Sequence, residues 1–353
     1  MWQRTRITER LNLTWPIFSA PMTPFATPSL AASVSNAGGV GGLGLTTFTV
    51  EECARRIAGF RQLTAGKLNA NLLLWPEVTG LENGFQAMRD RIGAYYREEE
   101  LGAPPDPVTS GSRLSEELLD VLLAAKPEVM SFHWSLPDRA ILEALKANGT
   151  FVIGCATTVA EARILETKGA DGIIAQGLEA GGHRGTFTDV GIEAQAGLFA
   201  LLPQIVDACS VPVIAAGGIS DGRSIAAAMA LGADAVWIGT AFLRCPEALV
   251  PDGHREALRH ANDAGTVVTR VVSGKPARVL PNKLVTELEA VEGGPLPFPA
   301  QYSLTKPLEA GGNPDLLQLY AGQAAALTRE LSAEELVAKL ADETDACFRA
   351  MNS

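Results

Sequence analysis

The 353-residue sequence has few features of secreted, membrane-spanning or nucleic-acid-binding proteins. No apolar run approaches the ~18 residues of a membrane-spanning helix, and the first residues, MWQRTRITERLNLTW, lack the apolar core of a signal peptide. The five cysteines are scattered without a CxxC pair, which predicts reduced thiols in a cytoplasmic protein. A net charge of -11 disfavours nucleic acid or an anionic membrane surface as the main partner.

Histidine is also scarce, with four in the chain. No cysteine, histidine and carboxylate cluster has metal-ligand spacing, so no metal site is predicted. His254 and His260 have helical spacing and charged neighbours, which predicts two solvated surface residues. His133 ends an apolar run and His183 lies among glycines, so these two histidines are the candidates for chemistry.

Eight short apolar runs have the length and continuity of strands buried on both faces. Segments with the apolar spacing of helices lie between them and end near glycines. This alternation predicts a parallel sheet with crossover helices, and eight repeats favour a closed (β/α)8 TIM barrel over an open doubly wound sheet. The predicted strands are 16–21, 38–45, 67–74, 128–134, 151–156, 172–177, 211–218 and 235–242.

Two polar stretches interrupt the alternation. Residues 75–114 follow the third predicted strand and are expected to form an insertion at the rim of a barrel made by residues 1–244. Residues 245–312 contain CPEALV, SGKPARVLPNK and GGPLPFPAQYSLTK, which predicts a smaller lid-like domain over the barrel mouth. Residues 313–353 have helical periodicity and are expected to pack back on the barrel.

Glycine-rich segments end the last two predicted strands. In (β/α)8 barrels, functional groups gather where strands end, and the last two loops often bind phosphate. Gly217 and Gly218 let the backbone approach an anion, and Gly239 with Thr240 does the same one strand further, with a hydroxyl added. Either segment alone fits a tight turn, whereas the two on adjacent strands favour a phosphate site.

Three further positions suggest a flat ligand in the barrel mouth. Ala20-Pro21-Met22 is a stiff apolar turn that suits a flat ring, although it also fits a simple strand-ending turn. Asn71 interrupts an apolar strand, so its amide needs a partner, either a ligand or a neighbouring strand loop. Gln176 ends the sixth predicted strand, and its amide is expected to face the mouth.

The stretch AQGLEAGGHRGTF, residues 175–187, surrounds His183 with glycines. A histidine of the core packs among side chains, so this position favours catalysis or substrate contact over a loop-stabilising hydrogen bond. His133 reaches the mouth by its position and is predicted to contact substrate, with a structural role equally open. Arg184 is predicted to be solvated, with a contact to an anionic substrate as the alternative.

Together these segments resemble the nitronate monooxygenase family, once called 2-nitropropane dioxygenases, in its bacterial class I branch. One departure is WIGT at 237–240, where the family commonly has QMGT, and this puts a side-chain bond from Trp237 in doubt. The matching segments are SAPM (19–22), NAGGVGGLG (36–44), NANL (69–72), SFHW (131–134), AQGLEAGGHRG (175–185), AAGGISDGR (215–223), IGTAFLRCPE (238–247), SGKPAR (273–278) and YSLTK (302–306).

The resemblance implies an FMN-binding barrel with a smaller second domain. It makes His183 the active-site histidine and places Tyr302 and Lys306 near the substrate. The residues that it places against FMN are Ala20, Pro21, Met22, Asn71, Gln176, Gly181, Gly218, Trp237, Ile238, Gly239 and Thr240.

The resemblance also implies an activity, the oxidation of alkyl nitronates such as propionate 3-nitronate by O2. The products would be a carbonyl compound plus nitrite or nitrate. The biological role would be nitronate detoxification, and the protein would be a monomer or a homodimer. His183 would hydrogen-bond or protonate the nitro oxygens, or deprotonate a neutral nitroalkane, and the sequence leaves these roles open. The alternatives are an NAD(P)H-dependent FMN reductase of a quinone or enoyl thioester, and a non-catalytic sensor of a phosphorylated ligand.

Overall fold

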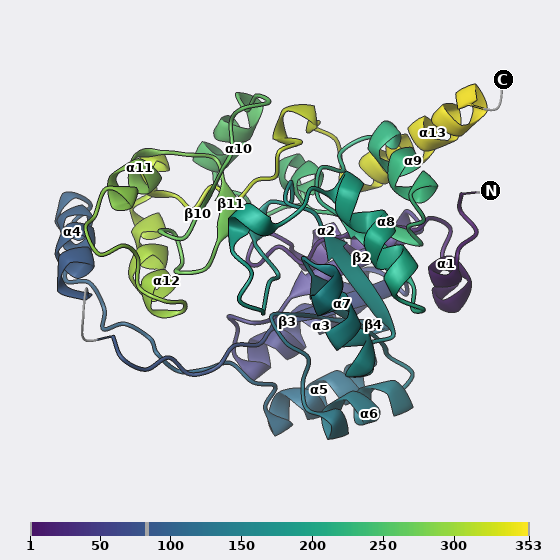
Figure 1. The fold of residues 1–353 in the computed structure, drawn as a ribbon, viewed down its shortest axis with the longest axis horizontal. Helices are drawn as coiled ribbons and strands as arrows, with labels where there is room; N and C mark the ends of the chain where they lie inside the picture. The colour runs from purple at the N-terminus through teal and green to yellow at the C-terminus, as the bar shows by residue number, and fades with distance from the viewer. Residues whose placement is uncertain (1, 82–84, 352–353) are drawn as a thin grey trace.

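The computed structural model describes residues 2–81 and 85–351, so residues 82–84 of the predicted insertion lie outside the described residues. All eight predicted strands form one closed parallel barrel, which confirms the (β/α)8 prediction and excludes the open sheet (Figure 1). In barrel order the strands are β1 (Ile17–Ser19), β2 (Val40–Gly44), β3 (Lys67–Leu73), β4 (Val129–His133), β5 (Phe151–Ala156), β6 (Gly172–Gln176), β8 (Val213–Ala216) and β9 (Ala235–Ile238).

Side chains along each barrel strand alternate between the barrel interior and the surrounding helices, as the strand period of two requires. In β9, Trp237 lies in the interior, where its ring stacks on that of Phe18 at 5.8 Å. Val236 and Ile238 point outward into the main hydrophobic core between strands and helices. This alternation decides which residues at the strand ends can reach the barrel mouth.

Helices cover the outside of the barrel. Those predicted from apolar spacing are present as α2 (Pro28–Asn36), α3 (Val50–Leu63), α6 (Arg139–Ala147), α7 (Val159–Thr167) and α9 (Gly222–Ala230).

α8 (Leu198–Ala208) was not expected from the sequence, because Gly197 offers no side-chain cap and Pro203 stands inside the helix. α1 (Arg6–Leu11) and α5 (Glu116–Ala125) were also not predicted. Within the described residues, no helix is both long and apolar enough to cross a bilayer.

A second lobe has its own hydrophobic core, which combines the two polar stretches of the sequence. Met88, Ile92 and Tyr96 pack with Leu284 and Leu304 in this core. In Figure 1 the blue helix α4 accordingly lies beside α11 and α12. The elements of this lobe are α4 (Phe85–Glu98), β10 (Val267–Thr269), β11 (Ala277–Val279), α11 (Lys283–Glu289) and α12 (Ala300–Thr305).

The second lobe is joined to the barrel by a small antiparallel sheet of order β10-β11-β7. β7 (Gly182–His183) belongs to the loop that follows β6, and His183 pairs with Ala277 of β11. The lobe therefore holds the backbone of the predicted active-site histidine directly. At the other side of the barrel, the C-terminal helix α13 (Ala333–Met351) packs against α9 and α2.

The surface prediction for His254 is wrong. His254 lies in α10 (Asp252–Arg259), is 1% exposed, and places its ring edge-to-face against Phe25. Its Nε2 lies 3.1 Å from the Tyr320 carbonyl oxygen. The charged neighbours of His254 occupy the opposite face of α10, which is why composition alone misjudged it. His260 is exposed, as predicted, and contacts Glu256.

Candidate functional site

A cavity of about 670 Å³ lies at the carboxyl ends of the barrel strands. It reaches from the interior residue Trp237 to the second-lobe residues Phe298 and Tyr302. All predicted site residues except Ile238 line it, namely Ala20, Pro21, Met22, Asn71, His133, Gln176, Gly181, His183, Gly217, Gly218, Trp237, Gly239, Thr240, Tyr302 and Lys306.

Ile238 does not reach the cavity because of the strand alternation. Its side chain is buried against the helix layer, 1% exposed. Its carbonyl oxygen instead accepts a hydrogen bond of 2.8 Å from the N–H of Ala20. Ile238 therefore holds the Ala20-Pro21-Met22 turn in place from behind.

The glycine cradle, which we define as Gly217, Gly218, Gly239 and Thr240, presents bare backbone to the cavity. Gly217 and Gly218 have φ values of 113° and 69°, a region that favours glycine. In the described part of the chain, the N–H groups of Gly218 and Gly239 have no hydrogen-bond partner. A Cβ on Gly239 would lie 3.4 Å from Ala20 Cβ and would fill part of this space. Such free N–H groups suit an anionic ligand.

Gly181 has a different reason to be glycine. A Cβ at this position would come within 2.5 Å of the backbone nitrogen of Gly322. The N–H of Gly322 in turn donates to Thr240 Oγ1 at 2.9 Å. Gly181 thus lets the chain around Gly322 pack against the cradle, in addition to lining the cavity.

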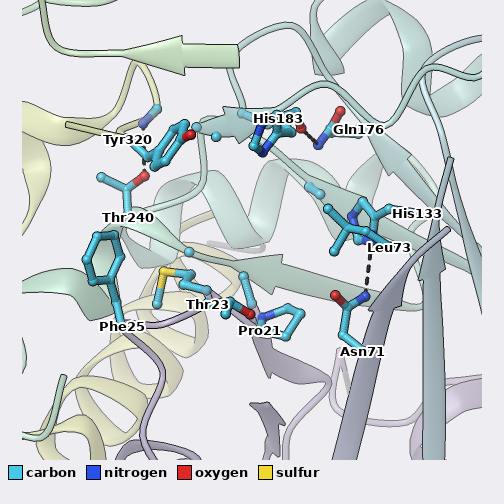
Figure 2. Close-up of a pocket in the computed structure, with 18 of the residues that line it drawn as sticks. Pro21, Thr23, Phe25, Asn71, Leu73, His133, Gln176, His183, Thr240 and Tyr320 are labelled. Atoms are coloured by element: carbon cyan, nitrogen blue, oxygen red, sulfur yellow. Dashed lines mark hydrogen bonds between the residues drawn. The ribbon is translucent and has the colours of Figure 1, made fainter. Parts of the chain in front are cut away.

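Asn71 finds its partners on the neighbouring strand β4 (Figure 2). Its Nδ2 donates to the Ser131 carbonyl oxygen at 3.0 Å and lies 3.1 Å from Nδ1 of His133. Because a carbonyl oxygen only accepts, this contact fixes the orientation of the amide and leaves Oδ1 to face the cavity as an acceptor.

Gln176 holds the loop that carries His183. Its Nε2 donates to the His183 carbonyl oxygen at 3.1 Å, and its Oε1 accepts from the N–H of Gly185 at 2.8 Å (Figure 2). Arg184 lies beneath this loop, fully buried, and donates to the carbonyl oxygens of Gln176 and Gly177. The prediction of a solvated Arg184 is therefore wrong, because its guanidinium donates hydrogen bonds to carbonyl oxygens of the loop.

The imidazole of His183 contacts one hydroxyl and several aromatic rings. Its Nε2 lies 2.8 Å from Ser273 Oγ, in the SGKPAR segment. Its ring packs edge-to-face on Trp134 at 5.4 Å between centroids, and 5.4 Å from Tyr320. We define the aromatic wall as Trp75, Trp134, Phe298, Tyr302 and Tyr320, which join one another or His183 through ring contacts.

Ser273 and most of the aromatic wall were not predicted from the sequence. Ser273 stands in a segment matched to the family, but nothing in the sequence showed that β11 would bring this segment beside β7. Trp134 follows His133 directly and has an unusual positive φ of 69°. Its indole N–H donates to the Arg184 carbonyl oxygen at 2.8 Å, so it braces the histidine loop.

Both cavity histidines are neutral at physiological pH. Burial lowers the pKa of His133 to about 4. Burial also lowers the pKa of His183 to about 3, with smaller contributions from the charge of Lys275 and from the neighbouring His133. Lys275 holds its ammonium over the ring of Trp134, 4.7 Å from the centroid. A neutral imidazole can donate one hydrogen bond and accept one.

Acid is expected to destabilise the protein before most carboxylates titrate. Burial lowers the pKa of His254, like that of His133, to about 4, against 6.5 for a free histidine. The unfolded state therefore binds more protons below pH 6.5, and the free energy of unfolding decreases as the pH falls from 6.5 toward about 5.

Thermal unfolding at half-unit pH steps measures this effect. His254→Phe removes one of the titrating groups and should make the decrease in Tm shallower. A Tm that stays constant from about pH 7 to about pH 5 would contradict the assignment of neutral buried histidines.

Comparisons with known proteins agree with this arrangement. A family model described as nitronate monooxygenase matches residues 4–343. A nitronate monooxygenase of Pseudomonas aeruginosa is 42% identical over 347 residues, which cover 96% of this chain and 98% of the relative. A probable nitronate monooxygenase of Staphylococcus aureus is 34% identical, with coverages of 97% and 98%.

Two solved structures share the whole fold. A nitroalkane oxidase from Streptomyces ansochromogenes superposes with a TM-score of 0.89 at 36% identity, covering 98% of this chain and 99% of that chain. FabK from Thermotoga maritima gives a TM-score of 0.78 at 29% identity, with coverages of 99% and 98%. The family model and both curated relatives name a flavin-dependent oxidoreductase family. The chain belongs to the nitronate monooxygenase family.

Proposed function

We propose that this protein oxidises alkyl nitronates with O2 and uses FMN as its cofactor. The observation that carries the proposal is a single cavity in which a cradle of free backbone N–H groups and a neutral histidine are brought together. The family membership supports the same reaction. The products would be a carbonyl compound plus nitrite or nitrate.

The cavity residues fit FMN. The glycine cradle offers unpaired N–H groups for the terminal phosphate, and the Ala20-Pro21-Met22 turn offers an apolar surface for a flat ring. Asn71 Oδ1 would accept a hydrogen bond from an N–H of that ring. When bound, FMN supplies the electron transfer from substrate to O2. The remaining chemistry, which is to bind and orient the nitronate, belongs to the protein.

We assign His183 the role of a neutral hydrogen-bond donor. Ser273 Oγ lies closer to His183 Nε2, at 2.8 Å, than to the Lys275 carbonyl oxygen, at 3.2 Å. The hydroxyl can donate to one of these two acceptors, and we propose that it donates to Nε2, so that the imidazole proton sits on Nδ1. The Nδ1–H can then donate to a nitro oxygen of the nitronate, where negative charge is concentrated.

This assignment predicts a preference for preformed nitronates over neutral nitroalkanes. An imidazole with a pKa of about 3 is too weak a base to remove a proton from carbon at neutral pH. Initial O2 uptake near pH 6 should therefore be at least ~100-fold faster with a freshly added nitronate than with the nitroalkane of the same chain. Similar initial rates with the two forms would show that a base in the cavity ionises the nitroalkane.

An anaerobic control separates this function from that of an NAD(P)H-dependent flavin reductase, which has the same barrel. The FMN-loaded protein is mixed with NADH or NADPH without O2, and the flavin absorbance is followed. We expect slow or no bleaching with either nucleotide and fast bleaching with a nitronate. Fast bleaching by NAD(P)H, with no response to nitronates, would overturn the proposed function in favour of the reductase.

A further inference from the structure

A buried carboxylate outside the cavity contacts the loop that carries His183. Glu161 lies in the first turn of α7, three residues after the N-cap Thr158, and is 0% exposed. A glutamate with this spacing in a capping box bonds only the N-terminus of its own helix. The described residues form no ion pair with Glu161, so hydrogen bonds must stabilise its buried charge.

The two oxygens of Glu161 bind two different segments of the chain. Oε2 accepts hydrogen bonds from the N–H and the hydroxyl of Thr157, at 2.7 and 2.8 Å. Oε1 accepts from the N–H groups of Phe187 and Thr188, at 2.8 and 3.1 Å. It also accepts from the hydroxyls of Thr186 and Thr188, at 2.8 and 2.9 Å. Glu161 thus joins the turn between β5 and α7 to the histidine loop, which we define as residues 177–188.

This arrangement requires an ionised carboxylate. Burial raises the pKa of Glu161, but the hydrogen bonds from Thr157, Phe187 and Thr186 outweigh burial and lower the pKa overall. An ionised carboxylate only accepts hydrogen bonds, so it satisfies the donors of both segments at once. A neutral amide in the same place would have to turn its NH2 group toward one of the two sets of donors.

The histidine loop is held on both sides of the imidazole. Before and at His183, the backbone pairs with β11, and after it the loop is bound by Glu161. Between these two attachments, Gly185 has no room to move, because a Cβ there would lie 2.4 Å from Cys155 Sγ. The indole of Trp134 packs on the imidazole and is bonded to the Arg184 carbonyl oxygen, so a shift of this half of the loop would also displace a ring contact of His183.

We propose that Glu161 is a positioning residue for nitronate oxidation, whose carboxylate fixes the second half of the histidine loop and so holds the imidazole of His183 where it can donate to the substrate. Glu161 does not line the cavity, so its effect on the reaction passes through His183. A misplacement of about 1 Å at a reacting group can lower the rate ~10²-fold. The inference rests on the proposed nitronate oxidation with His183 as the donor.

Two matched threonine variants test the inference. Thr186→Val and Thr157→Val each remove one buried hydroxyl that lies 2.8 Å from the same carboxylate, the first from the histidine loop and the second from the turn after β5. Both should lower Tm by a similar amount. In FMN-loaded protein, Thr186→Val should lower kcat/KM for an alkyl nitronate about tenfold, and Thr157→Val less than about twofold. Equal losses of kcat/KM in the two variants would overturn the inference in favour of a purely structural carboxylate.

A double-mutant cycle with His183→Leu shows whether the effect passes through the imidazole. Glu161→Met removes every contact of the carboxylate and should lower kcat/KM about 100-fold in the wild-type background. In the His183→Leu background the further loss should be less than about threefold, because the group that is positioned is already absent. If Glu161→Met does not fold, Thr186→Val takes its place in the cycle. Equal losses in both backgrounds would overturn the inference.

Hydrogen–deuterium exchange gives a measurement that is independent of turnover. Thr186→Val should speed exchange in peptides from residues 177–188 about tenfold, whereas Thr157→Val should leave exchange there unchanged. Unchanged exchange of this loop in Thr186→Val would overturn the inference alone. Absence of turnover of every nitronate by the FMN-loaded wild-type protein would overturn the proposed function, and the positioning role with it.

Discussion

Replacing His183 by leucine should lower kcat/KM for an alkyl nitronate by ~10²–10³, the usual effect of removing one positioned donor from an enclosed site. Leucine fills the space between Trp134 and Tyr320 but cannot donate to a nitro oxygen. FMN should remain bound, because the glycine cradle belongs to other loops. Steady-state O2 uptake and the flavin absorbance of the purified variant measure both quantities.

His183→Asn distinguishes a donor from a base. The asparagine amide can occupy the position of Nδ1, so it should recover about tenfold of the activity that leucine loses if this nitrogen donates a hydrogen bond. An amide is not a base, so no recovery would be expected if His183 removed a proton. Wild-type turnover by the leucine variant would show that His183 has no catalytic role.

Gly218→Ala should weaken FMN binding about 100-fold, through loss of the phosphate contact. The new Cβ would lie 3.4 Å from Glu179 Cβ, an ordinary contact, so the loop can keep its shape. At φ 69°, however, alanine is strained, and its methyl group adds bulk to the cradle through which the phosphate approaches. Fluorescence titration with FMN measures the change in Kd.

Riboflavin and a second glycine provide the controls. Riboflavin has no phosphate, so its Kd should change much less than that of FMN in Gly218→Ala. Gly312→Ala introduces the same backbone strain at φ 72°, with no heavy atom within 4 Å of the new Cβ, at a residue that does not line the cavity. It should lower Tm similarly and leave FMN binding unchanged. An equal loss of FMN affinity in both variants would assign the effect to strain alone.

Local sequence patterns were sufficient to predict the barrel fold. Each strand is a short apolar run between turn residues, and side chains such as Thr27, Thr49 and Thr158 accept hydrogen bonds that cap the helices that follow. The cavity-lining positions at the strand ends followed from the same patterns, because functional groups in such barrels lie where strands end, whereas Gly181, Tyr302 and Lys306 were implied by the family resemblance. Where the local signal was absent, as in α8 with its internal Pro203, the prediction failed.

Local sequence patterns gave wrong predictions for the burial of charged and polar side chains. Arg184 and His254 both stand in polar segments, and both are buried in the folded chain. The partners of Arg184 are backbone carbonyls of its own loop, and the carbonyl beside His254 belongs to Tyr320, 66 residues away. Every residue has a backbone carbonyl, so no residue type in the sequence marks either partner.

The sequence by itself determined the eightfold alternation, the glycine cradle and the unusual position of His183 among glycines. These features depend on residues close together in the chain, whose spacing and backbone freedom are readable directly. Only the tertiary structure decided that β11 brings Ser273 beside His183, that the rings of the aromatic wall meet over the imidazole, and that Glu161 binds the histidine loop. The protonation state of His183 and the charge of the cavity depend on burial and on through-space distances, which arise only when the two lobes pack together.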